Sequence, residues 1–67
     1  MLHVELRYYA NNRNELLKRY LDKYLVIKGR KVIATYDTHA MAREESLKTM
    51  SIGTFLIEHC IPRHSML

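Results

Sequence analysis

Two apolar runs on either side of a glycine constrain this chain more than any other feature. Residues Tyr24–Lys28 and Lys31–Tyr36 are rich in β-branched and aromatic side chains. Between them, Gly29 supplies the positive φ that a tight turn requires, so the pattern predicts a β-hairpin. Both alternating sets of side chains are apolar, whereas a sheet with one face in water alternates apolar with polar residues. We therefore expect part of the second face to be covered.

Helical and extended patterns follow the hairpin. Asp37 or Thr38 is expected to cap a helix over His39–Met50, because either side-chain oxygen can accept a hydrogen bond from the free N–H groups of the first turn. Residues Gly53–Cys60 are expected to form a third strand. That strand stops before Pro62.

The first third of the chain fits two descriptions. A helix is expected over Asn12–Leu21, and its first residue is spaced from Glu15 as in a capping box. Residues 2–8 alternate apolar with polar side chains as a strand does, but residues 6–21 also repeat at helical spacing. The first helix therefore starts either at residue 12 or earlier, near Val4.

These elements predict an α+β fold of order α-β-β-α-β. The simplest sheet places the first strand in the centre, which gives a three-stranded antiparallel sheet of order 2-1-3 with two helices. If residues 2–8 form a strand instead, the alternative is a ferredoxin-like βαββαβ fold. The chain has 67 residues, enough for one domain. We place that domain at residues 1–61, followed by a flexible tail at residues 62–67.

Several segments are together similar to a family of small bacterial proteins of unknown function. The matching residues lie between about Tyr8 and Cys60, in the segments Lys23–Lys28 (KYLVIK), Val32-Ile33, Tyr36–Thr38 (YDT) and Gly53–Cys60 (GTFLIEHC). The resemblance implies one long N-terminal helix, and it implies no activity, cofactor or catalytic residue. Family members often carry Gly near Asp22, an aromatic residue at position 43 and Gln at position 58, where this chain has Asp22, Arg43 and Glu58.

Apolar residues in excess of what two short helices can cover indicate the function that we favour. If both helices pack on the same side of the sheet, one face, or the edge formed by Thr54–Cys60, stays open. Exposed apolar area on a small domain marks an interface. We therefore predict a protein-interaction or assembly module that forms a homodimer, whereas a monomer would suffice with one helix on each face. The predicted interface residues are Tyr24, Val26, Phe55, Leu56 and Ile57.

Basic residues are concentrated in the middle of the chain and suggest an alternative function. The chain has a net charge of +4, yet the segment Lys18–Lys31 contains six basic residues and one acid, a net charge of +5. Basic and aromatic side chains together suit phosphate contact and base stacking. A solvated hairpin rim, whose lysines deter edge pairing, explains the same pattern. The alternative is weak, non-specific nucleic-acid binding through Lys18, Arg19, Lys28, Arg30 and Lys31.

The residue types of catalytic and metal sites do not gather in the sequence. Cys60 and His64 are two ligands where a structural zinc needs four. His59 and Cys60 are adjacent in a predicted strand and point to opposite faces, so His59 is a poor base for the thiol. Asp37 is explained as a helix cap. The sequence has no Gly-rich phosphate loop, no Ser-His-Asp pattern and no HExxH motif. We expect no enzyme activity, no metal and no cofactor.

Cysteine content and hydropathy predict a cytoplasmic protein that does not contact a membrane. The single Cys60 cannot form the internal disulfides on which small secreted domains rely. Residues 1–9 do not have the pattern of a signal peptide. The longest uncharged stretch, Thr49–Ile57, is far shorter than the roughly 20 apolar residues of a membrane helix.

Overall fold

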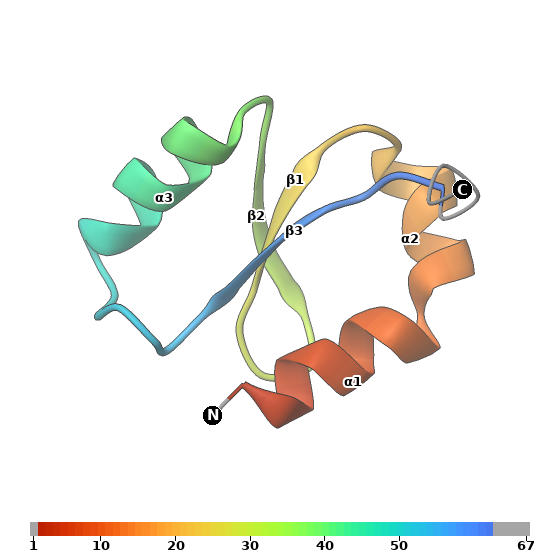
Figure 1. Cartoon of the computed structure of the whole chain (residues 1–67), viewed down its shortest axis with the longest axis horizontal. Helices are drawn as coiled ribbons and strands as arrows, with labels where there is room; N and C mark the ends of the chain where they lie inside the picture. Colours follow the sequence, from red (N-terminus) through yellow and green to blue (C-terminus); the bar gives the residue numbers. More distant parts are fainter. Residues whose placement is uncertain (1, 63–67) are drawn as a thin grey trace.

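The computed structural model describes residues 2–62, which form three helices and one three-stranded sheet (Figure 1). In chain order the elements are α1 (His3–Asn11), α2 (Arg13–Tyr20), β1 (Tyr24–Ile27), β2 (Val32–Tyr36), α3 (His39–Leu47) and β3 (Leu56–His59). Both neighbours of β1 run antiparallel to it, and the order is β2-β1-β3. The predicted α+β fold and sheet order are confirmed. The predicted tail beyond Pro62 lies outside the described residues.

The N-terminal third is helical from His3, so the ferredoxin-like alternative is wrong. The helix is nevertheless interrupted at Asn12, whose φ of −112° is not helical. The predicted capping box is also wrong, because the Asn12 side chain donates from Nδ2 to the carbonyl of Tyr8, at 2.9 Å. The Asn12 side chain therefore closes the end of α1 rather than the start of α2, although the Asn12 carbonyl accepts the N–H of Leu16. This is why the structure has two N-terminal helices where the sequence predicted one.

Helix α3 begins as the sequence predicts. The backbone N–H of Met41 donates to Oγ1 of Thr38, at 3.1 Å, so Thr38 is the cap. Asp37 has a different role, because its carboxylate accepts a hydrogen bond from Nζ of Lys23, at 2.6 Å. The helix ends at Leu47 rather than Met50, and tighter turns follow it. The third strand is correspondingly shorter than predicted and begins at Leu56.

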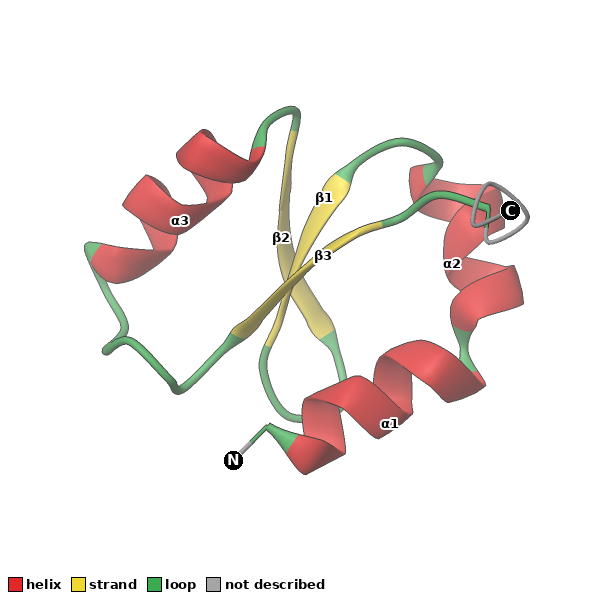
Figure 2. Cartoon of the chain, in the orientation of Figure 1, coloured by secondary structure: helices red, strands yellow, loops and turns green. Residues whose placement is uncertain are grey.

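Helices cover both faces of the sheet, with α1 and α2 on one face and α3 on the other (Figures 1 and 2). The expectation that the helices pack on the same side is wrong, so the dimer prediction loses the open sheet face and keeps only its second basis, the edge of the third strand. Alternate residues of β1 point to opposite faces, which is why both sets are apolar. The core under α1 and α2 consists of Tyr9, Leu16, Leu25, Ile27 and Cys60. The core under α3 consists of Val26, Ala42 and Phe55.

The sheet has an irregularity on each side of β1. On the β2 side, Val26 pairs with Ala34 and Ile27 pairs with Val32, so Ile33 is the extra residue of a β-bulge. On the β3 side, Asp22 has a φ of +65° and donates its N–H to the carbonyl of Cys60. The second irregularity lies in the residues before β1, so β3 itself stays regular.

Candidate functional site

The outer edge of β3 carries backbone groups that point away from the sheet. The N–H of Cys60 donates to the carbonyl of Lys23, at 2.8 Å, and every second residue of an antiparallel strand bonds to the same neighbour. Glu58 therefore also bonds to β1, whereas the N–H and C=O groups of Ile57 and His59 point to the free edge. The carbonyl of His59 accepts a long hydrogen bond from the hydroxyl of Tyr9, at 3.4 Å. The β3 edge is therefore open at Ile57.

A groove runs along each side of this edge. The α3 groove, on the α3 face, has a volume of about 230 Å³ and is lined by His39, Arg43, Leu47, Ile52, Gly53, Phe55 and Ile57. The α1 groove, on the other face, has a volume of about 290 Å³ and is lined by Leu6, Tyr9, Ala10, Arg13, Glu58 and His59. Each groove has a large apolar side chain in water: Ile52 is 73% exposed and Leu6 is 48% exposed.

One acidic and one basic residue line the α1 groove. Burial raises the pKa of Glu58 above its ordinary value, and the positive charge of Arg13 opposes this shift. The guanidinium of Arg13 donates to the carbonyl of Ile61, which holds it beside the end of β3. Burial also raises the pKa of the Cys60 thiol, whose side chain has no exposed surface. Cys60 is therefore a packed, protonated thiol rather than a nucleophile.

The structure divides the five predicted interface residues. Val26 is 0% exposed and Phe55 is 8% exposed, so both belong to the core under α3 and are not available to a partner. Tyr24 is partly buried under α3, with the His59 ring stacked on it at 4.1 Å. Leu56 and Ile57 are partly buried and flank the β3 edge on opposite faces. Sequence reasoning missed Leu6, which lies far from β3 in the chain, and Ile52, which lies in an irregular segment.

The predicted basic cluster also divides in space. Lys18 and Arg19 belong to α2, whereas Lys28, Arg30 and Lys31 lie at the hairpin turn, at the other end of β1 (Figure 1). Nζ of Lys28 donates to the carbonyl of Thr54, at 3.0 Å. These five residues therefore do not form one surface.

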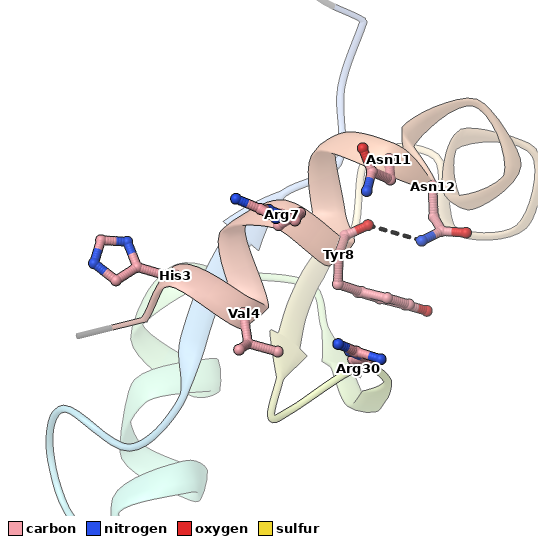
Figure 3. A pocket seen from close by; sticks show the side chains of 7 residues that line it. All are labelled: His3, Val4, Arg7, Tyr8, Asn11, Asn12 and Arg30. Atoms are coloured by element: carbon pink, nitrogen blue, oxygen red, sulfur yellow. Dashed lines mark hydrogen bonds between the residues drawn. The ribbon is translucent and has the colours of Figure 1, made fainter.

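The hairpin turn instead meets α1 around a cavity of about 470 Å³, which we call the α1–hairpin cleft (Figure 3). The cleft is lined by His3, Val4, Arg7, Tyr8, Asn11, Asn12 and Arg30. Its two walls are joined by Glu5, whose Oε2 accepts the backbone N–H of Gly29 at 2.8 Å. This hydrogen bond is the first cause that lowers the pKa of Glu5. Arg7 was not predicted, because it lies outside the basic segment of the sequence.

Metal-binding residue types are dispersed within residues 2–62. No three His, Cys, Asp or Glu side chains there lie close enough together to hold a metal ion. Nε2 of His59 lies 2.8 Å from Oδ1 of Asp22, and His64 lies outside the described residues. None of the described helices is long and apolar enough to cross a membrane.

Comparisons with protein-family models, curated proteins and solved structures found no match to this chain. The resemblance to the bacterial family therefore stays a prediction.

Proposed function

We propose that the protein is a self-associating assembly module, a homodimer in which the β3 edges of two copies pair antiparallel. The observation that carries this proposal is the β3 edge itself. It is regular, it is open at Ile57, and it runs between two grooves that each expose an apolar side chain. Unpaired strand edges of this kind bind a further strand through main-chain hydrogen bonds.

A two-fold axis at Ile57 is the pairing that the ladder favours. Because its N–H and C=O groups point outward, Ile57 of each copy can exchange both hydrogen bonds with Ile57 of the other. The same register sets Leu56 against Glu58 and Phe55 against His59 of the second copy. It also joins the two three-stranded sheets into one continuous sheet.

A second copy suits the two grooves as well as the edge. The two-fold axis brings each α1 groove toward its equivalent on one face, and each α3 groove toward its equivalent on the other. The exposed side chains of Leu6 and Ile52 then lose contact with water on both faces of the joined sheet. Burial of apolar area on both faces is what a short edge pairing needs for stability. Closed two-fold dimers are also the commonest oligomers.

The experiment is multi-angle light scattering over a hundredfold range of micromolar concentrations. We expect the mass to rise from 8.0 kDa toward twice that value as the concentration increases. A constant mass of 8.0 kDa over the whole range contradicts the proposal. Capture of an extended peptide by a protein that stays monomeric also contradicts it.

A matched pair of variants on α1 locates the interface. Leu6 and Val4 are 48% and 47% exposed on the same helix, but Leu6 lines the α1 groove beside β3 and Val4 lines the α1–hairpin cleft. Leu6→Glu places a charge in the dimer interface and should keep the protein monomeric. Val4→Glu adds the same charge outside the interface and should leave the dimer intact. Equal effects of the two variants contradict pairing at β3.

A further inference from the structure

Two arginines from different elements line the α1–hairpin cleft, and neither is engaged elsewhere. Arg7 comes from α1 and Arg30 from the hairpin turn. Among residues 2–62, neither guanidinium has a hydrogen-bond or ion-pair partner. Unpaired guanidinium groups present planar forks of donors that match the oxygens of a phosphate. The cleft therefore carries phosphate-binding groups that the fold itself does not use.

No carboxylate lines the cleft, and the one that joins its walls, on Glu5, accepts a hydrogen bond from the hairpin turn. The seven lining residues include no Asp or Glu. Glu5, which lies on α1 between His3 and Arg7, accepts the N–H of Gly29 and so holds the hairpin turn against α1. This bond makes Glu5 a positioning residue, because it fixes the distance between the two walls. The cleft is thus a preformed cationic site.

The remaining lining groups suit a nucleotide rather than an isolated anion. Val4 and Tyr8 lie on the side of α1 that faces Arg30 (Figure 3). The amide groups of Asn11 and Asn12 also line the cleft, and Asn12 is held by its hydrogen bond to the carbonyl of Tyr8. Aromatic rings beside cationic groups bind single strands by stacking on a base while the cations contact the phosphates. A volume of about 470 Å³ is within the range of small-molecule sites.

Further cations continue beyond the cleft along the hairpin turn. Lys31 follows Arg30 in sequence and is exposed, as is Lys28, whose Nζ also donates to the carbonyl of Thr54. A free mononucleotide has no use for charges outside the cleft, whereas a strand places its next phosphates there.

We propose that the α1–hairpin cleft binds single-stranded nucleic acid, with Arg7 and Arg30 on its phosphates and a base against Tyr8. Sequence reasoning placed nucleic-acid contacts in one segment that included α2; the cleft keeps Arg30, adds Arg7 and omits Lys18 and Arg19. The proposal does not depend on pairing of the β3 edges, because α1 presents the α1 groove and the cleft through different residues.

The test is fluorescence anisotropy with a labelled ten-nucleotide uridine RNA at several salt concentrations. The double variant Arg7→Gln/Arg30→Gln should weaken binding by about tenfold or more for each arginine. It should also reduce the slope of log K against log salt by about 1.4, because two phosphate contacts are lost. The matched control is Lys18→Gln/Arg19→Gln, which removes the same charge from α2 and should leave both quantities almost unchanged.

A second comparison keeps both arginines. Val4→Glu adds an acid to the cleft and should abolish binding, whereas Leu6→Glu adds it to the opposite side of α1 and should preserve binding. Circular dichroism melting confirms that each variant is folded before binding is compared. Wild-type protein that does not bind the RNA, an equal effect of the α2 control, or equal affinity for free uridine monophosphate overturns the proposal.

Discussion

The two edges of the sheet are built differently, although both are short strands paired to β1. The β2 edge is interrupted by the bulge at Ile33, and Lys31 precedes the strand. The β3 edge is regular along its length, and its one charge, Glu58, is partly buried in the α1 groove. Bulges and lysines are devices that keep a strand from pairing with another chain. In the proposed dimer, β2 is therefore the protected edge and β3 the pairing edge.

The largest expected difference between the edges concerns packing. Phe55 lies just before β3, is 8% exposed and belongs to the core under α3, whereas Ile33 in β2 is 40% exposed. Phe55→Ala should cost about 3–5 kcal/mol of unfolding free energy, and Ile33→Ala should cost less than about 1 kcal/mol. Urea denaturation of both variants measures the difference. Similar losses at the two positions would remove the contrast between the edges.

A smaller effect is expected at the junction that leads from β2 into α3, the helix that walls the groove beside β3. Thr38→Ala removes the acceptor for the N–H of Met41 and should cost about 0.5–2 kcal/mol. Asp37→Ala removes only an exposed ion pair with Lys23 and should cost less than about 1 kcal/mol. Thermal melting ranks the two variants. A larger loss at Asp37 than at Thr38 would show that the cap is misassigned.

A residue two positions before β1 offers a stabilising change of about the same size. Asp22 has a φ of +65°, a conformation that glycine adopts without the steric cost that a β-carbon brings. Asp22→Gly should raise the unfolding free energy by up to about 1 kcal/mol, even though the exposed contact with His59 is lost. Asp22→Ala, the control, loses the same contact without gaining that freedom and should destabilise. If both variants lose stability equally, the contact with His59 outweighs the backbone effect.

The smallest effect concerns the charge at the β3 edge. Burial raises the pKa of Glu58, so the folded protein binds this proton more tightly than the unfolded chain does. The contribution is therefore fully present at pH values below the unfolded pKa, and it is lost as the pH rises through the raised folded pKa. Glu58→Gln should be more stable than the wild type at neutral pH by less than about 1 kcal/mol, because the group is partly solvated. Parallel pH profiles of the two proteins would contradict this cause.

Much of the fold follows from local sequence patterns. Gly29 between two β-branched runs determines the hairpin, and Thr38 before a run of helix formers determines where α3 begins. The sheet order follows from short connections. The split at Asn12 does not follow, because the same residue type can cap the start of a helix or bond back to the helix before it.

The candidate surfaces were predicted less completely. Period-two alternation identified Leu56 and Ile57 on opposite faces of β3. It also identified Val26 and Phe55 as apolar, but the pattern does not distinguish an apolar strand residue in a core from one in an interface. Whether they are exposed depends on α3 covering the opposite face from α1 and α2. That Arg7 and Arg30 line one cleft depends likewise on tertiary packing, through the bond between Glu5 and Gly29.

Amide hydrogen exchange at Ile57 and Thr35 tests the contrast between the edges most directly. In β1, the backbone N–H and C=O groups of Leu25 point toward β3, so those of Tyr24 and Val26 point toward β2. Thr35 lies opposite Leu25 and therefore makes no backbone hydrogen bond to β1. The N–H of Thr35 thus points away from the sheet, as that of Ile57 does. In NMR exchange experiments over a hundredfold dilution series, protection of Ile57 should increase with protein concentration while Thr35 exchanges rapidly throughout. Rapid exchange at Ile57 at every concentration, or protection that grows at Thr35 instead, would contradict pairing at β3.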